Sequence, residues 1–222
     1  MKNKYEKGHL IVLNGGSSAG KTSTLNALQD MFDSLWVNVG IDCCWMAMPP
    51  RQVQLDTVEQ NYFIMKTYQE KEQDYFHITP GPLLDKAMYA GYSAIAAYLE
   101  SGVNVVSDQL FWKPEWFRVA LEAWIPYHVF FVGIHASDEE GSRREEKRGV
   151  EAGGDVQAGV RARGWHRCSS KITHKDMIYD FEIDNSILSV KKTAAQIKTA
   201  YENISTPQAF KKLYKTFLPK AT

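Results

Sequence analysis

The sequence is poor in cysteine, and the three cysteines present are arranged in a way that argues against two common kinds of small domain. Cys43 and Cys44 are adjacent, and Cys168 is far from both. An odd number that includes a neighbouring pair does not suit a disulfide framework. Without a Cys-x-x-Cys pair or histidines at ligand spacing, a structural zinc site is not expected either. We interpret the three as reduced thiols of a cytoplasmic protein.

The chain also lacks net charge and long apolar runs. Its 26 basic residues balance 26 acidic ones, so the broad positive field that nonspecific nucleic-acid binding requires is not expected. The first apolar run, Leu10–Leu13, is too short for a signal peptide, and no stretch approaches the ~20 apolar residues of a membrane span. We therefore expect a cytoplasmic protein that binds neither nucleic acid nor membrane, and the sequence leaves its oligomeric state open.

What the chain does contain is an alternation of strands and helices. Continuous apolar runs predict strands that are covered on both faces, at residues 9–14, 35–39, 103–107, 128–134 and 179–184. Helical spacing or a helix-start proline predicts helices at about 22–32, 82–101, 114–124 and 189–202, with a short one before Pro49. Residues 61–79 predict a hairpin or an irregular excursion. Since 44% of the 222 residues are hydrophobic, we predict a single α/β domain over 1–222. It would be an open, mainly parallel five-stranded sheet with helices on both faces, an arginine-bearing lid at about 137–164 and a basic, helical C-terminal extension at about 189–222.

One motif carries the functional prediction, because the string from Gly15 to Thr22 fits G-x-x-x-x-G-K-[ST] without a mismatch. It lies between a buried-type strand and an amphipathic helix, as the motif requires; an ordinary glycine-rich turn is the alternative. Glycines let backbone amides turn toward phosphate oxygens, and the helix N-terminus adds partial positive charge. Lys21 can reach the β- and γ-phosphates, and the Thr22 hydroxyl can bind Mg²⁺. The sequence thus predicts a site for ATP or GTP with Mg²⁺, whose nucleotide-binding residues are Gly15, Gly16, Ser17, Ser18, Ala19, Gly20, Lys21, Thr22 and Ser23.

Two carboxylates follow strands that should end beside this loop. Asp108 comes directly after the run at 103–107 and is a candidate Mg²⁺ ligand together with Thr22, although a turn or capping role is the alternative. Asp42 follows the second strand. Ligands of an open parallel sheet lie beyond the carboxyl ends of its strands, so Asp42 should face the same crevice. From the residues alone, an N-cap role for the next helix explains Asp42 equally well.

Arginines in the charged, glycine-bearing segment 137–164 are candidates for phosphate contacts, and we expect this segment to be a mobile lid. Arg144 and Arg148 are four residues apart, hence on one helical face, and guanidinium groups suit a transferring phosphoryl group. A solvated helix paired along its own length is the alternative. The same role is open to Arg143, Arg161 and Arg163.

Exclusion narrows the class of protein. The nearest string to the guanine-recognition pattern N-K-x-D is 173–176, which has no asparagine and places its lysine one position too late. An ABC-type signature is absent and the chain is short for a motor ATPase, which leaves a small-molecule kinase.

His166 and His174 lack ligand spacing and are interpreted as surface or structural residues. Apolar residues near the strand ends either line an acceptor pocket or pack in the core: Trp45, Met46, Met48, Tyr62, Phe63, Phe111 and Trp112.

The same segments resemble the chloramphenicol phosphotransferase family of antibiotic kinases. The likeness lies in the strings 15–22, 40–42, 47–49, 144–149 and 179–184 and in the strand before Asp108, spread over roughly residues 9–190. The resemblance implies that Asp42 is the base that accepts the proton of the substrate hydroxyl. It also implies that Arg144 and Arg148 belong to a lid over the phosphates, so the predicted catalytic residues are Asp42, Lys21, Arg144 and Arg148.

The acceptor stays open at this point, because the chain departs from the family pattern at 61–76, at 151–175 and in its C-terminal extension. The predicted activity is transfer of phosphate from ATP or GTP to a hydroxyl of a small molecule, with an antibiotic as one candidate acceptor. A nucleotide-sugar or nucleoside-like acceptor, as in zeta-type toxins, is one alternative. A nucleotide-binding protein that does not transfer phosphate is another.

Overall fold

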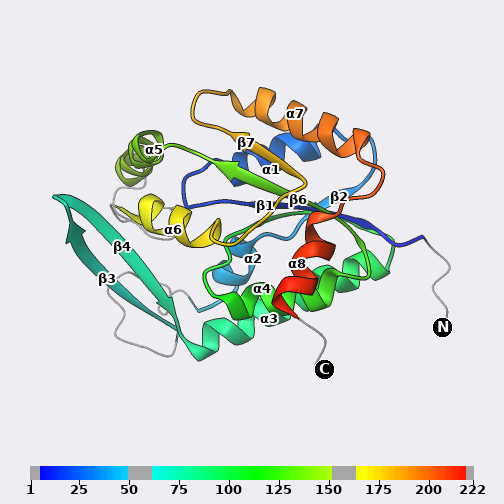
Figure 1. Ribbon diagram of the computed structural model, residues 1–222, viewed down its shortest axis with the longest axis horizontal. Helices are drawn as coiled ribbons and strands as arrows, with labels where there is room; N and C mark the ends of the chain where they lie inside the picture. Colours follow the sequence, from blue (N-terminus) through cyan, green and yellow to red (C-terminus); the bar gives the residue numbers. More distant parts are fainter. Residues whose placement is uncertain (1–5, 50–61, 152–163, 219–222) are drawn as a thin grey trace.

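A five-stranded parallel sheet forms the centre of the molecule (Figure 1). The computed structural model describes residues 6–49, 62–151 and 164–218. The order of the strands across the sheet is β2-β5-β1-β6-β7, and all four neighbouring pairs are parallel. Non-sequential neighbours require crossovers, and helices supply them. The strands are β1 (His9–Asn14), β2 (Trp36–Asn38), β5 (Asn104–Gln109), β6 (His128–His135) and β7 (Phe181–Asp184).

Helices cover both faces of the sheet, and alternate residues of β1 show how. Leu10 and Val12 pack into one hydrophobic cluster, whereas Ile11 and Leu13 pack into the other, as the two-residue period of a strand requires. This is why β1 reads as an unbroken apolar run. The first cluster lies under α3 (Pro82–Glu100), α4 (Pro114–Trp124) and α8 (Ala209–Phe217), and the second under α1 (Lys21–Gln29) and α7 (Val190–Asn203).

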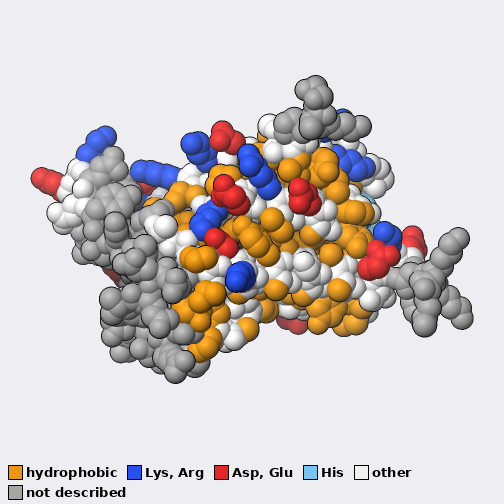
Figure 2. All heavy atoms as spheres, turned by 90° about the horizontal axis from the view of Figure 1, so that it is seen from below, with side chains coloured by type: hydrophobic (Ala, Val, Ile, Leu, Met, Phe, Trp, Pro, Cys, Tyr) orange, Lys and Arg blue, Asp and Glu red, His pale blue; other side chains and the backbone are white. Residues whose placement is uncertain are grey.

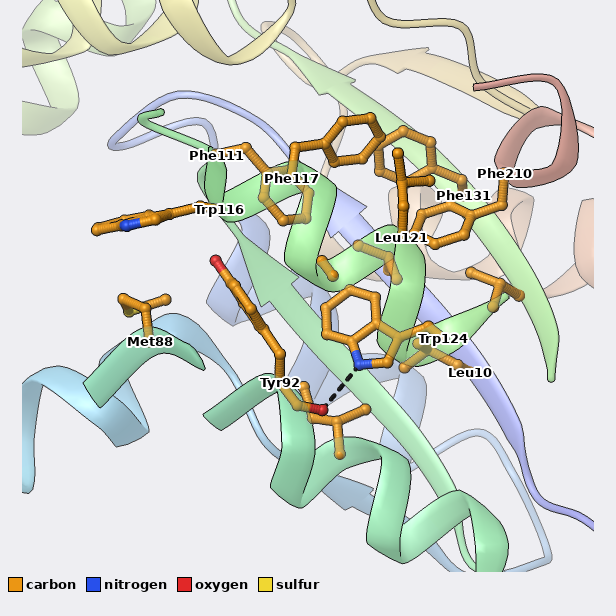
Figure 3. Packing of buried hydrophobic residues seen from close by; sticks show 14 of the residues in the cluster. Leu10, Met88, Tyr92, Phe111, Trp116, Phe117, Leu121, Trp124, Phe131 and Phe210 are labelled. Carbon is orange, nitrogen blue, oxygen red and sulfur yellow. Dashed lines mark hydrogen bonds between the residues drawn. The ribbon is translucent and has the colours of Figure 1, made fainter. Parts of the chain in front are cut away.

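Aromatic side chains fill the larger cluster (Figure 3). Trp124 is fully buried, and its indole N–H donates to the carbonyl oxygen of Tyr92 over 3.0 Å, which satisfies the one polar atom that it brings into the core. Phe210 of α8 stacks on Trp124 with ring centroids 6.1 Å apart. The basic C-terminal extension is therefore more than a charged tail. Its helix α8 buries Phe210 and Leu213 while its lysines stay exposed.

The remaining elements gather at the carboxyl ends of the strands (Figure 1). Residues 61–79, predicted to be a hairpin or an irregular excursion, contain an antiparallel hairpin. Its second strand lies against α6, a helix that the sequence did not predict. The expected lid begins as a regular helix, α5, and residues 152–163 lie outside the described part of the chain. These elements are α2 (Ile41–Met46), β3 (Phe63–Glu70), β4 (Gln73–Pro80), α5 (Asp138–Glu151) and α6 (Trp165–Thr173).

Acidic and basic side chains are interspersed on the face shown in Figure 2, where they lie among hydrophobic and neutral ones. In the ranges that the structure describes, no helix is both long enough and apolar enough to cross a membrane.

Candidate active site

The loop between β1 and α1 has the backbone shape of a phosphate cradle. Ser18 has φ 58° and Gly20 has φ 92°, both in the left-handed region. Turns that alternate in this way direct successive N–H groups to the same side, where they form a concavity for an anion. Gly20 is also the residue before the first turn of α1, so the free amides of the helix N-terminus face this concavity.

Side chains hold the carbonyl oxygens of the loop, one after another from Gly15 to Ala19. The Lys21 ammonium donates to the carbonyl oxygens of Gly15 and Gly16, over 2.8 Å and 2.7 Å. The imidazole Nδ1 of His166 donates to the Ser17 carbonyl over 2.6 Å. A carbonyl oxygen facing a phosphate would repel it, so donors that occupy these oxygens favour the orientation in which the amides bind the anion.

Arg144 and Asn185 complete the series on the other side of the loop. Arg144 Nη1 lies 3.3 Å from the Ser18 carbonyl oxygen, and Asn185 Nδ2 donates to the Ala19 carbonyl over 2.8 Å. Arg144 also donates to the Asn185 carbonyl over 2.7 Å and to the Glu140 carboxylate over 2.8 Å. Its guanidinium is therefore fixed against the loop. The solvated-helix alternative expected pairing along α5, and only the bond to Glu140 runs that way.

The other lid arginines are placed differently. Arg143 forms an ion pair with Glu140, and together with Arg144 it lowers the pKa of that carboxyl to about 2. Arg148 is half-buried near the C-terminal end of α5 and makes no hydrogen bond to the loop within the described residues. Arg161 and Arg163 fall outside those residues. Of the predicted arginines that the structure describes, Arg144 is thus the one that contacts the loop.

Asp108 and Thr22 bring two oxygen ligands together at the mouth of the loop. The Thr22 hydroxyl donates to Asp108 Oδ2 over 2.6 Å, and the carboxylate is only 3% exposed. Burial raises the pKa of Asp108, and the nearby Asp42 carboxylate adds to this effect, whereas Lys21 and the Thr22 hydrogen bond lower it. Its backbone lies in β5 beside Leu13, so the parallel register places it next to the loop.

This oxygen pair fits Mg²⁺. Mg²⁺ is usually held by one or two carboxylates, with waters and phosphate oxygens as its other ligands, and not by a cage of protein groups. In the part of the chain that the structure describes, no three His, Cys, Asp or Glu side chains gather as a metal site. Thr22 and Asp108 are the residues that would hold the ion.

Asp42 lies in the first turn of α2 and is exposed. The residue that precedes this helix as its N-cap is Gly40, so the capping role considered for Asp42 is wrong. A Cβ on Gly40 would lie 1.8 Å from Asp108 Oδ1, which shows how tightly α2 begins against the Asp108 carboxylate. Asp42 therefore follows, by two residues, a glycine that lies against Asp108, the predicted metal ligand.

The apolar residues considered for an acceptor pocket divide between core and surface. Met48, Phe111 and Trp112 are buried, as in the core-packing alternative. Met46 is 57% exposed beside Asp42, and Trp45 is half-buried. Tyr62 is half-buried too, and the side chain of Phe63 lies outside what the structure describes.

The sequence did not predict the buried polar network that lies beneath the loop. Asn14 donates from its amide to the Thr173 carbonyl and to the Tyr179 hydroxyl, each over 2.8 Å, and accepts from the Thr173 hydroxyl over 2.7 Å. The Tyr179 hydroxyl lies 2.7 Å from His174 Nδ1. His166 is fully buried. His166 is thus a structural residue, and His174 is held in the network although it is partly exposed.

Comparisons with known proteins agree with this geometry. The family model "Chloramphenicol phosphotransferase-like protein" matches residues 8–202. A protein of two Mycobacterium tuberculosis strains, described as "Putative O-phosphotransferase", is 42% identical over 213 residues, covering 96% of this chain and 90% of the relative.

Solved structures of kinases share the fold at low sequence identity. The M. tuberculosis APS kinase CysC in complex with AMPPNP and APS has a TM-score of 0.58 at 12% identity and covers 89% of this chain and 99% of its own. A gluconokinase from Sinorhizobium meliloti 1021 has a TM-score of 0.55 at 14% identity and covers 96% and 99%. The five-stranded sheet is therefore that of the P-loop kinases.

Proposed function

The chain belongs to the chloramphenicol phosphotransferase-like family, and from this membership we propose that it is a phosphotransferase that moves a phosphoryl group from ATP or GTP to a hydroxyl of a small molecule. The observation that carries the proposal is the meeting of three features at one edge of the sheet. These are the loop with its carbonyls held outward, the Thr22–Asp108 oxygen pair and the exposed Asp42 carboxylate at the start of α2. A protein that only bound nucleotide would need Lys21 and Thr22 but would have less use for Asp42 and Asp108.

The proposed reaction assigns a task to each group. The loop amides and Lys21 bind the β- and γ-phosphates, and Mg²⁺ on Thr22 and Asp108 would neutralise developing charge. The acceptor oxygen forms a bond to the γ-phosphorus while the bond from that phosphorus to the bridging oxygen breaks, and the nucleoside diphosphate leaves. Asp42 accepts the proton of the acceptor hydroxyl. Arg144, and Arg148 when the lid segment closes, would stabilise the charge on the transferring group.

The acceptor that fits best carries an apolar group near its reactive hydroxyl. Met46 and Trp45 follow Asp42 on α2 and leave apolar surface beside it. Binding sites for small molecules combine such surface with a few polar groups that fix orientation. Hydroxylated antibiotics of the kind that names the family meet this description, which makes them the first class to test.

The test is a screen of hydroxylated antibiotics and metabolites with γ-labelled ATP and GTP. We expect label to pass to at least one acceptor, identified by mass spectrometry, and to be lost in Lys21→Ala but retained in Lys191→Ala, a matched exposed lysine on α7. A parent protein that labels no acceptor and binds neither nucleotide by calorimetry would contradict the proposal.

A further inference from the structure

We propose that His166 is a positioning residue that fixes the phosphate loop in its nucleotide-binding conformation, and that α6 is the support of this loop. The inference rests on the proposed function and extends it to an element about 150 positions away in the sequence, which no motif marks. Its basis is a set of contacts that α6 makes with one residue of the loop, Ser17.

Helix α6 occupies both backbone groups of Ser17. The Ser17 N–H donates to Ser169 Oγ over 2.8 Å, and the Ser17 carbonyl accepts from His166 Nδ1 over 2.6 Å. Ser169 and His166 are both fully buried, so water does not compete for these bonds. The spacing of three places the two side chains on one face of α6.

These bonds control the amides that would face a phosphate. The carbonyl of Ser17 and the N–H of Ser18 belong to one planar peptide unit and point in opposite directions. Holding the carbonyl toward His166 therefore directs the Ser18 N–H to the other side. Ser18 itself has φ 58°, a conformation that a residue with a side chain seldom adopts without support from its surroundings.

The imidazole also couples the loop to the helix that bears the lid arginines. Its ring packs so closely on α5 that a Cβ at Gly141 would lie 2.1 Å from His166 Cδ2. The backbone N–H of His166 donates to the Glu145 carboxylate, and its Nε2 lies 3.3 Å from the Ala136 carbonyl oxygen. Gly141 precedes Arg144 by three residues. The same ring thus locates both the loop and the start of the arginine-bearing helix.

The chemistry of the contact defines the variants that test it. A carbonyl oxygen only accepts, so Nδ1 must carry a hydrogen. The amide nitrogen of asparagine reaches about the position of Nδ1 and can donate in its place, whereas phenylalanine fills the ring volume and cannot donate. His166→Asn should therefore rescue part of what His166→Phe loses. His128→Phe, a half-buried histidine on β6 with its own stacked partner His9, is the matched control.

Calorimetric titration with ATP and with GTP, in parallel with steady-state kinetics, decides the matter. We expect His166→Phe to weaken nucleotide affinity roughly tenfold, with a smaller loss for His166→Asn and none for His128→Phe. The KM for nucleotide should rise while the KM for acceptor stays near the parent value. A merely structural role would lower the folded fraction and leave the KM for nucleotide unchanged.

Two outcomes overturn the inference, and they are separable from each other. If the parent binds nucleotide and the folded His166 variants bind it equally well, the positioning role is wrong and the proposed function stands. If the parent binds neither nucleotide, the proposed function is wrong and the inference falls with it. Ser169→Ala, which removes one buried hydroxyl, tests the other contact of α6 with Ser17 should His166→Phe not fold. An unchanged affinity in that variant would then count against the role of α6.

Discussion

The polar network beneath the phosphate loop predicts how stability depends on pH. The Tyr179 hydroxyl oxygen accepts from Asn14, so its own hydrogen is available to His174 Nδ1, which must then be unprotonated. Burial, and to a smaller extent the nearby His135 and Lys21, lower the pKa of His174 to about 3. A proton on Nδ1 would break the bond from Tyr179 and place a charge in a partly desolvated site near Lys21.

The direction of this pH dependence follows because the pKa of His174 in the folded protein lies below its unfolded value of ~6.5. Between these two pKa values the unfolded chain binds more protons than the folded one, so the stabilisation is complete above the unfolded pKa and is lost as pH falls through the window. At pH 5 linkage gives a loss of ~2 kcal/mol, and a folded pKa one unit higher gives nearly the same figure. Because the ring is partly exposed, we reduce the expectation to ~1–2 kcal/mol.

Urea unfolding at pH 7.5 and pH 5.0 measures this effect when the parent is compared with His174→Asn. Asparagine can accept from Tyr179 and does not titrate, so the variant should lose ~1–2 kcal/mol less than the parent between the two pH values. His9 and His128 also have lowered pKa values, and Glu140 has one near 2, but these groups are common to both proteins and cancel in the difference. Identical pH dependence of the two proteins would refute the reasoning.

Three further predictions concern the site. Lys21→Ala should stay folded but lose most of its affinity for ATP and GTP; unchanged binding and turnover would remove the loop from the function. Gly40→Ala has an allowed backbone but pushes on Asp108 Oδ1, so the Mg²⁺ concentration for half-maximal activity should rise severalfold; an unchanged Mg²⁺ dependence would count against the assigned metal ligand. Arg144→Ala should raise the KM for nucleotide, because it releases the loop, and should also lower kcat, whereas Arg148→Ala should lower kcat alone. The reverse pattern would exchange their roles.

Although the edge strands β2 and β7 are only partly buried, the centre of the sheet could be predicted because β1, β5 and β6 are buried on both faces. Such strands are continuously apolar, and the run at Leu10–Leu13 has no other ready explanation. The helices α1, α3, α4 and α7 likewise present apolar residues at helical spacing. Their ends were less predictable, and α1 stops at Gln29 instead of Phe32.

Helix α6 was missed, and α8 was predicted only as part of a basic, helical extension at about 189–222, for opposite physical reasons. The face that α6 buries is polar, with His166, Ser169 and Thr173 turned toward the loop and Asn14, so no apolar periodicity marks it. In α8 the buried residues are the apolar Ala209, Phe210 and Leu213. They are few, and the exposed lysines obscure any apolar periodicity in so short a segment.

The motif located the loop but not the groups that shape it. The string from Gly15 to Thr22 contains the residues that turn and the lysine, because these are local requirements. His166 and Asn185 hold the Ser17 and Ala19 carbonyls from about 150 and 166 positions away, and only the fold brings them there. Their signal in the sequence is at most a buried polar residue at the start of a helix or the end of a strand.

The central claim is that Asp42 takes the proton of the acceptor hydroxyl, and Asp42→Asn tests it most directly. The side chain is exposed in the first turn of α2, so the substitution should cost no more than ~1 kcal/mol of stability. Asp138→Asn, an exposed aspartate in the first turn of α5, is the matched control. Measured at saturating nucleotide and acceptor, we expect Asp42→Asn to lower turnover by roughly 100-fold or more with nucleotide affinity unchanged, and Asp138→Asn to behave as the parent. Turnover of Asp42→Asn within a few-fold of the parent would contradict the account.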